Sequence, residues 1–279
     1  MSRSPAHEIA DPRDEYVLGH SENEVRRLTL QADMLRSITE RLMRNAGIRE
    51  GMKVLDLGCG AGDVSMLAAE LVGPSGRVVG IDRVSDVLGL AVERSKRAGY
   101  DNIVFQEASL ATFTEIGTFD LVIGRYVLIH QSDGTSFVRA AAKCVRPGGV
   151  LAFHELCLWK PTYPFPVPLY DKALGWLTKA VQSAFLGPEA ADRLAMHFLD
   201  ADLPRPAMFS EMVVGCVESP LLLWLPDTLR SMMPVVTRLN IATEEEVGID
   251  TLSDRIREAA LETKGLLTSP LQVCGWARL

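Results

Sequence analysis

Residues Val54 to Asp63 read Val-Leu-Asp-Leu-Gly-Cys-Gly-Ala-Gly-Asp, and this pattern is the strongest indication of the fold class. A short apolar run leads directly into three alternating glycines, Gly58, Gly60 and Gly62, and a helical pattern follows. Glycines remove side chains, so a ligand can approach the backbone of such a turn closely. A buried strand, a glycine-rich turn and a helix in this order are typical of the ligand-binding edge of a doubly wound α/β sheet. We therefore predict a Rossmann-like fold with a ligand site at this turn.

Short apolar runs alternate with amphipathic segments along the rest of the chain. The predicted strands are Lys53–Leu57, Arg77–Ile81, Asn102–Gln106, Phe119–Gly124, Val150–His154, Ala207–Gly215 and Leu271–Ala277. The predicted helices after the first strand are Asp63–Leu71, Ser85–Ala98, Ser136–Val145, Tyr170–Phe185, Pro188–Asp200, Leu221–Asn240 and Leu252–Lys264. Continuous apolar strands that alternate with helices predict a parallel sheet covered on both faces, with right-handed crossovers. The fold class is therefore α/β, with a doubly wound, seven-stranded and mostly parallel sheet.

The chain is expected to form one domain behind a flexible tail of residues 1–20. Ser21 and Glu24 resemble a capping box at the start of a helix. After Glu155 the rhythm is interrupted by Trp159–Pro168, which is rich in proline and aromatic residues and predicts an insertion over the carboxyl edge of the sheet. We divide residues 21–279 into a helical cap (21–47), a cofactor-binding core (48–155), a substrate-lid insertion (156–205), and C-terminal strands and helices (206–279).

The glycine spacing helps to select the ligand. A dinucleotide site needs a third glycine where this chain has Asp63, and it needs a free helix N-terminus for the pyrophosphate. A carboxylate in the first helical turn already uses the helix dipole and would repel a pyrophosphate. A P-loop is excluded because no Gly-Lys-Ser/Thr follows. The ligand should lack phosphate and tolerate carboxylates, as do the cationic sulfonium and ammonium groups of S-adenosylmethionine.

An acidic residue, Asp82, ends the second predicted strand, Arg77–Ile81. A carboxylate at this place can accept hydrogen bonds from the two hydroxyl groups of a ribose, and it follows the glycine turn at about the expected distance of 20 residues. A solvent-exposed aspartate without a ligand is the alternative, and the glycine turn before it favours the ribose site.

The charge balance argues against a nucleic-acid partner. The net charge is −7 and the sequence pI is about 5.3. A protein that binds nucleic acid needs a dense basic face, and the sequence contains no basic run. We therefore expect neither DNA nor RNA as substrate.

Cysteine usage and hydropathy predict a cytoplasmic protein. The five cysteines are scattered without a Cys-x-x-Cys pair, which favours reduced thiols over a structural zinc site. The N-terminal stretch has no apolar run of signal-peptide type, and no segment approaches the roughly 20 apolar residues of a membrane span. The cysteines are Cys59, Cys144, Cys157, Cys216 and Cys274.

Taken together, these motifs make the chain similar to the class I S-adenosylmethionine-dependent methyltransferases. More narrowly, it resembles a bacterial branch that acts on small molecules and shares Tyr-x-Leu-Gly-His and Arg-Leu-x-x-Gln in an N-terminal helical cap. The resemblance covers Tyr16 to Glu155 well and the remainder by topology. The matching stretches are Tyr16 to His20, Arg27 to Gln31, Val54 to Asp63, Asp82, Gln106 to Ala108, Phe119 to Arg125 and Arg146 to Gly149. The family has Gly-Asp-Ala where this chain has Gln106-Glu107-Ala108, which keeps an acceptor on a longer side chain.

The resemblance implies S-adenosylmethionine as cofactor and indicates which residues bind it. Tyr16 would close over the cofactor and Gln31 would hydrogen-bond its amino-acid end, although both can equally be surface residues of a covering helix. The implied cofactor-binding residues are Tyr16, Gln31, Asp56, Gly58, Cys59, Gly60, Gly62, Asp82, Arg83, Glu107, Ala108 and Arg125.

A methyl transfer by in-line displacement depends mainly on holding the acceptor behind the methyl group and excluding water. An acceptor hydroxyl or carbon acid can also need a base, and His130 and His154 follow the fourth and fifth predicted strands. Glu155 would orient His154 or take the proton itself. The alternative is that these three residues are structural. No acidic pair follows the fourth strand, so we predict no metal ion.

The methyl acceptor is predicted to be a small, hydrophobic molecule, because the insertion is apolar and aromatic. Enzymes that methylate amino groups on bases usually carry an Asn/Asp-Pro-Pro-aromatic motif after the fourth strand. Gly124 to Val127 lack this motif, which argues against such a substrate. Three alternatives stay open: a nucleotide-dependent oxidoreductase, a protein that binds the cofactor without methyl transfer or with altered chemistry, and a methyltransferase for a protein or a lipid quinone. The segment Leu221–Asn240 can pack internally or against a second subunit of a homodimer.

Overall fold

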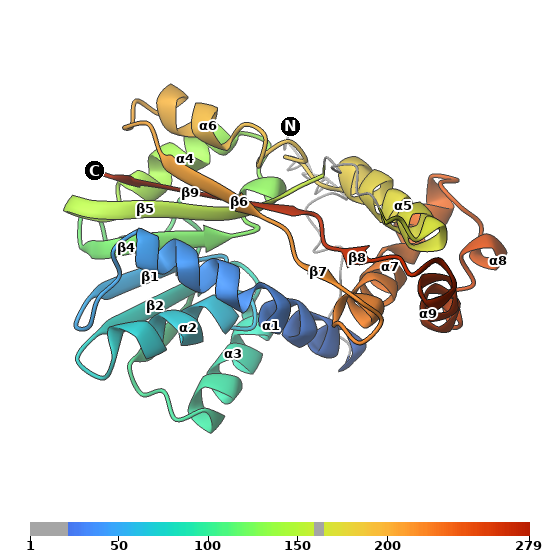
Figure 1. The fold of residues 1–279 in the computed structure, drawn as a ribbon. Coiled ribbons are helices and arrows are strands. Elements are labelled where there is room, and N and C mark those ends of the chain that lie inside the picture. The colour runs from blue at the N-terminus through green and yellow to red at the C-terminus, as the bar shows by residue number, and fades with distance from the viewer. Residues whose placement is uncertain (1–21, 159–164) are drawn as a thin grey trace, which may run out of the picture.

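A single seven-stranded sheet forms the centre of the molecule. The computed structural model describes residues 22–158 and 165–279, and the strand order is β3-β2-β1-β4-β5-β9-β6 (Figure 1). The strands β1 to β5 pair in parallel, whereas β9 runs antiparallel to both of its neighbours, so the predicted seven-stranded and mostly parallel sheet is confirmed. The strands are β1 (Lys53–Leu57), β2 (Arg77–Asp82), β3 (Ile103–Glu107), β4 (Phe119–Arg125), β5 (Val145–Cys157), β6 (Ala207–Glu211) and β9 (Leu271–Arg278).

Helices cover both faces of this sheet, because its central strands are apolar on both sides. One face packs against α1 (Glu22–Asn45) and α2 (Asp63–Val72) through residues such as Leu35 and Leu67. The other face packs against α4 (Gly134–Ala142) and α6 (Leu194–Asp200) through residues such as Val138 and Phe198. The helix α3 (Ser85–Arg97) packs beside the edge strand β3. Among the described residues, no helix is both long enough and apolar enough to cross a bilayer.

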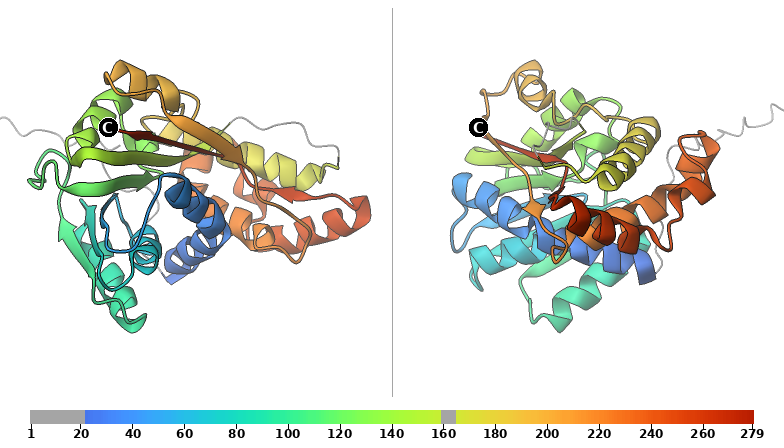
Figure 2. Two further views of the ribbon diagram at one scale, coloured as in Figure 1. Left: turned by 60° about the vertical axis from the view of Figure 1, so that its left-hand side comes forward. Right: turned by 45° about the vertical axis from the view of Figure 1, so that its right-hand side comes forward.

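A helical lobe extends from the carboxyl edge of the sheet (Figures 1 and 2). It consists of α5 (Pro168–Ala184), α7 (Leu221–Arg238), α8 (Glu244–Val247), α9 (Leu252–Thr263) and the small sheet of β7 (Val214–Gly215) and β8 (Leu267–Thr268). The N-terminal half of α1 reaches this lobe and packs against α7, and the apolar core continues from the sheet into the lobe without a break. The helix α7 therefore buries its apolar face within the chain.

The insertion after β5 is divided between two places. The helix α5 joins the lobe, but α6 lies against α4 on one face of the sheet. We expected residues 156–205 to form one lid over the carboxyl edge, and the structure places only the α5 part there. His197 of α6 explains the docking of the second part, because its ring lies where Gly134 of α4 has no side chain and its Nδ1 lies 3.0 Å from the Thr135 hydroxyl.

Most element boundaries follow the sequence, and the exceptions have local causes. The helix predicted at Ser136–Val145 is observed as α4, which starts at Gly134. It starts earlier because Asp133 caps it by accepting a hydrogen bond from the Ser136 N–H at 2.9 Å. The predicted cap Ser85 lies inside α3, whose first turn has no side-chain cap. The predicted strand Ala207–Gly215 breaks into β6 and β7, which belong to different sheets. The sequence patterns did not indicate the short elements α8, β8 and the 3-10 helix η1 (Leu128–His130).

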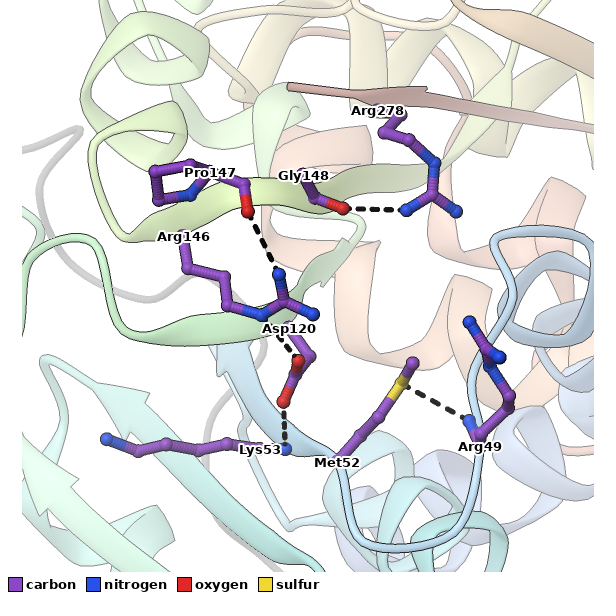
Figure 3. A network of polar contacts seen from close by, with 8 residues as sticks. All are labelled: Arg49, Met52, Lys53, Asp120, Arg146, Pro147, Gly148 and Arg278. Atoms are coloured by element: carbon purple, nitrogen blue, oxygen red, sulfur yellow. Dashed lines mark hydrogen bonds and ion pairs between the residues drawn. The ribbon is translucent and has the colours of Figure 1, made fainter.

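Asp120 ties together the amino ends of three neighbouring strands (Figure 3). Its Oδ2 accepts a hydrogen bond of 2.8 Å from the Lys53 N–H at the start of β1, and its Oδ1 accepts one of 2.7 Å from Arg146 Nε in β5. Burial alone would raise the pKa of Asp120, but these donors outweigh burial and lower it. Asp120 itself lies in β4, so one carboxylate joins β1, β4 and β5 at the edge opposite the glycine turn.

We predict that Asp120→Asn lowers the free energy of unfolding by about 1 kcal/mol, because a partly exposed charged hydrogen-bond acceptor is lost. Urea unfolding followed by circular dichroism measures this change. The matched control is Asp101→Asn at an exposed position, where we expect a change within about 0.5 kcal/mol. Equal effects of the two substitutions would contradict the role assigned to Asp120.

Candidate active site

The glycine turn between β1 and α2 is a narrow loop with left-handed backbone at all three glycines. The φ angles are +60° at Gly58, +51° at Gly60 and +85° at Gly62. A Cβ at Gly58 would lie 2.7 Å from Val127 Cγ1, and one at Gly62 would lie 2.9 Å from the Phe105 ring. A Cβ at Gly60 would meet nothing within 4 Å. Two of the glycines are thus required by packing, and the third leaves open space beside its backbone.

Asp82 lies directly beside this loop at the carboxyl end of β2. Its Oδ2 accepts a hydrogen bond of 2.9 Å from the Gly60 N–H, and its Oδ1 accepts one of 3.1 Å from the Val84 N–H. The carboxylate is half-buried, and each oxygen keeps further lone-pair capacity for hydroxyl donors. Glu107 is the register partner of Asp82 on β3 and is exposed, as is Arg83. The structure thus brings the predicted residues Asp82, Glu107 and Gly60 to one edge.

Asp56 lies beneath the loop on the face covered by α2. It is buried, and the Ser65 hydroxyl donates a hydrogen bond of 2.6 Å to its Oδ2. Burial raises the pKa of Asp56 to about 7, against the opposing effects of Ser65 and Arg125. Burial likewise raises the pKa of the Cys59 thiol, so Cys59 carries no reactive thiolate at neutral pH. Asp56 and Cys59 therefore support the loop from inside.

The carboxylate of Asp63 is paired within the protein. Arg94 of α3 donates a hydrogen bond of 2.6 Å to Asp63 Oδ1 and one of 2.7 Å to the carbonyl oxygen of Ala61. We expected the charge of Asp63 to repel a pyrophosphate, but this ion pair compensates it. The argument against a dinucleotide therefore rests on the missing third glycine alone, because Asp82 would suit the ribose of either ligand. Asp63 serves to hold the loop through Arg94.

A tight turn follows β4 at the same edge. Tyr126 has a φ of +58°, which is unusual for a residue with a side chain, and its N–H donates to the carbonyl oxygen of His154 at 2.9 Å. His130 ends the turn, and its ring lies 4.8 Å from that of Phe185. Burial, followed by the charge of Arg83, lowers the pKa of His130 to about 4. His130 is neutral at neutral pH and is partly exposed.

His154 of β5 is completely buried in a polar chain that joins α1, β5 and β9. Its Nε2 lies 3.1 Å from Gln272 Oε1, and its Nδ1 lies 3.0 Å from the Thr39 hydroxyl. Gln272 Nε2 donates to the carbonyl oxygen of Pro270, so its Oε1 is an acceptor and the His154 proton resides on Nε2. Burial and the charge of Arg125 lower the pKa of His154 to about 3. The structure therefore places this predicted base inside the core, with both ring nitrogens engaged.

The neighbouring Glu155 is also fully buried, on the opposite face of β5. Its Oε1 accepts hydrogen bonds from the N–H groups of Val127, at 2.9 Å, and Leu128, at 2.8 Å. Within the described residues, its Oε2 has no hydrogen-bond partner. Burial raises the pKa of Glu155 to about 8 despite these donors. Glu155 does not contact the ring of His154 in the way that we had considered.

The predicted cap residue Gln31 lies where α1 meets the helical lobe. Its Oε1 accepts hydrogen bonds from Arg27, at 3.0 Å, and from Trp224 Nε1, at 3.3 Å. Arg125 reaches toward the same helix and donates a hydrogen bond of 3.3 Å to the Thr39 hydroxyl. Tyr16 lies outside the described residues. Among the described residues, no group of three His, Cys, Asp or Glu side chains is arranged to hold a metal ion.

Several supporting residues were not indicated by the sequence. Ser65, Arg94 and Gln272 lie 9, 31 and 118 residues from the partners they hold. No local spacing marks such pairs, because they form only when distant segments meet. Tyr126 directly follows β4, and its positive φ had no signal in the sequence, because tyrosine is not a residue that indicates positive φ.

The fold and the site define the class of protein. Residues 48–186 match a family described as methyltransferase domain. A putative methyltransferase from Bacillus halodurans has the same fold, with a TM-score of 0.56, 19% identity and coverage of 87% of this chain and 98% of that structure. Through this domain, the chain belongs to the class I S-adenosylmethionine-dependent methyltransferases.

Two curated relatives of this chain are methyltransferases, and the name of each contains the name of a quinone. The demethylmenaquinone methyltransferase of Lactococcus lactis is 33% identical over 165 residues, which are 59% of this chain and 62% of the relative. The ubiquinone biosynthesis O-methyltransferase of Methylocella silvestris is 31% identical over 157 residues, which are 55% of this chain and 59% of the relative. The chain thus spans about three fifths of the length of the curated relatives it matches.

We predict that Gly58→Ala damages the loop more than Gly60→Ala. Both glycines have positive φ, so both substitutions share the backbone strain, but only a Cβ at Gly58 would collide with Val127. The melting temperature should fall by several degrees more for Gly58→Ala, and Val127→Ala in the same chain should recover part of that difference. Equal melting temperatures for the two alanine variants would contradict the packing constraint at Gly58.

We also predict that His154 stays neutral far below the usual histidine pKa of 6.5. Because the folded state keeps its pKa at about 3, unfolded chains bind a proton that folded chains do not, and stability declines as pH falls from about 6.5 toward 3. The slope from this one group cannot exceed about 1.4 kcal/mol per pH unit. Proton NMR of the ring Cε1–H measures the titration directly. A His154 signal that titrates near pH 6.5 would show that the ring is not held in the core.

Proposed function

We propose that this protein transfers a methyl group from S-adenosylmethionine to a small molecule. The observation that carries the proposal is the loop with open space beside Gly60 and the carboxylate of Asp82 next to it. If the ribose hydroxyls bind Asp82, the nucleoside lies against the backbone of Gly60, which carries no side chain. Family membership of residues 48–186 supports the same cofactor.

The residues at this edge fit the chemistry of that cofactor. Asp82 would hold the ribose, and Glu107 with Ala108 would border the adenine, since the Ala108 N–H bonds the carbonyl oxygen of Asp82 at 2.9 Å and places the two strand ends together. Gly58, Gly60 and Gly62 present backbone to the ligand. The guanidinium of Arg125, together with Gln31, is available for the amino-acid end. These assignments need no phosphate-binding group at the loop.

The chain's own contribution to the reaction is to position the reactants and exclude water. When bound, the cofactor supplies an electrophilic methyl group on sulfur, and displacement transfers that methyl to a nucleophilic atom of the acceptor. Orientation at near-attack distance can account for several kcal/mol of the barrier. Of the three candidate bases, His130 is partly exposed, whereas His154 and Glu155 are buried. We therefore keep His130 as the candidate proton acceptor and assign supporting roles to the other two.

The acceptor that we propose is hydrophobic. The lobe that extends from the carboxyl edge brings Trp224 of α7 to Gln31 of α1, and its apolar core is continuous with that of the sheet. Apolar packing beside the sheet edge favours an apolar ligand of limited size. The names of the two relatives point to quinone precursors, which are molecules of this kind.

The other expectations about partners remain proposals. The net charge of −7 supports a small-molecule acceptor over nucleic acid. We propose a cytoplasmic location from the cysteine usage. Internal packing of α7 against α1, α5 and α9 accounts for the segment Leu221–Asn240, and the homodimer stays a prediction.

We predict that the wild-type protein binds S-adenosylhomocysteine and that Asp82→Asn weakens this binding at least tenfold, because hydrogen bonds from the ribose to a charged acceptor are lost. Isothermal titration calorimetry measures both affinities. The matched control is Asp86→Asn, an exposed aspartate in the first turn of α3, which should bind as the wild type does. An equal loss in both variants would contradict the role of Asp82.

Transfer itself is tested with a labelled methyl donor and a panel of apolar phenols, quinols and thiols. Incorporation of label into an acceptor is the expected result. Binding of S-adenosylhomocysteine without any transfer would favour a binding protein or altered chemistry on the same fold. Binding of NAD in its place would favour an oxidoreductase.

A further inference from the structure

Val127 is the point of contact between the turn after β4 and the glycine loop. A Cβ added to Gly58 would lie 2.7 Å from Val127 Cγ1, and one added to Gly124 would lie 2.5 Å from Val127 Cγ2. The valine side chain therefore fills the space between the end of β4 and the loop, and it is buried. The position of this side chain limits where Gly58 can lie.

The backbone of Val127 is in turn held by Glu155. The chain leaves β4 through the left-handed residue Tyr126, which directs the N–H groups of Val127 and Leu128 to the single oxygen Oε1 of Glu155. Two buried backbone donors thus depend on one side chain, and each would be left without a partner if that oxygen were removed.

The same turn also receives the insertion that follows α5. The Gly187 N–H donates to the carbonyl oxygen of Ile129 at 2.9 Å, and a Cβ at Gly187 would lie 2.6 Å from the carbonyl oxygen of Leu128. The turn is therefore confined between the glycine loop and the insertion, with Glu155 at its base.

We infer that Glu155 is a positioning residue of the S-adenosylmethionine site. Its Oε1 fixes the turn of residues 126–130, so that Val127 supports Gly58 and keeps the glycine loop in the conformation that binds the cofactor. This inference rests on the proposed function for its effect on cofactor affinity. A buried carboxyl with a raised pKa of about 8 agrees with this role, since the proton-bearing form still has one acceptor oxygen for the two N–H groups.

The test compares Glu155→Gln, which keeps an acceptor oxygen, with Glu155→Leu, which removes it at similar size. Calorimetry with S-adenosylhomocysteine should show an affinity at least tenfold lower for Glu155→Leu, and an affinity within about threefold of the wild type for Glu155→Gln. Once a molecule that accepts the methyl group has been found, Glu155→Gln should keep most of the wild-type kcat. A kcat that is lost in both variants while affinity is kept would overturn the inference, because a proton-transferring Glu155 would behave in this way.

The path through Val127 is tested by a double-mutant cycle. Val127→Ala should lower the affinity, and its combination with Glu155→Leu should be little worse than Glu155→Leu alone; additive losses would overturn the inference. The matched control is Val138→Ala, a buried valine of α4 in the same apolar cluster, which should lower the melting temperature but keep the affinity. If Glu155→Leu does not fold, the affinities of Val127→Ala and Val138→Ala for S-adenosylhomocysteine are compared instead. Equal affinities of these two variants would contradict the inference.

Hydrogen exchange of the ligand-free protein separates this inference from the proposed function. The amides of residues 58–62 should exchange faster in Val127→Ala than in Val138→Ala, whether or not the wild type binds S-adenosylhomocysteine. Wild-type protein without affinity for that molecule refutes the proposed function alone. Unchanged exchange at residues 58–62 refutes the support of the loop by Val127.

Discussion

The close approach of the glycine loop to its neighbours governs how the carboxyl edge of the sheet is built. Gly58 fits against Val127 and Gly62 fits against Phe105, so the loop can lie between β1 and α2 only because these positions carry no side chain. The residues that face the loop are themselves fixed, Val127 by its contacts with the end of β4 and Phe105 by β3. Asp82 then bonds the N–H of Gly60 and completes the arrangement at the sheet edge.

Buried polar groups support this edge from below. Three such groups are paired: Asp56 with Ser65, His154 with Gln272, and Glu155 with the turn after β4. The last two pairings join segments that lie far apart in the sequence. Such groups are costly to bury unless they are paired, and pairing specifies which segments lie together. At the opposite edge, Asp120 does the same for the amino ends of β1, β4 and β5. The polar network thus fixes the sheet at both ends, and the apolar residues fill the space between.

The sequence predicted the fold well, because the strands are short, apolar and bounded by glycine or proline turns. Lys53–Leu57 was predicted with its observed limits, and β5 extended beyond its prediction at both ends because β9 and β4 continue to pair with it. The rhythm of strands and helices predicted a doubly wound, mostly parallel sheet, but it did not specify the order of the strands. The division of the insertion could not be predicted, since the docking of α6 on α4 depends on His197 lying against Gly134, which only the folded chain brings together.

The position of Asp82 could be predicted, because its residue type and its place at the end of β2 coincide, and the structure places it beside the glycine loop. The role of a residue was less predictable where burial decides it. His154 and Glu155 follow a strand at the carboxyl edge, which suggested proton transfer, but exposure cannot be determined from such a pattern. Asp63 was expected to act by its charge, and Arg94, which compensates that charge, lies 31 residues away.

A crystal structure with S-adenosylhomocysteine would show whether the loop beside Gly60 and Asp82 holds a nucleoside. We expect both ribose hydroxyls to lie within hydrogen-bond distance of the Asp82 carboxylate, with the ligand against the backbone of Gly60. A ligand bound elsewhere, or a ribose turned away from Asp82, would contradict this expectation.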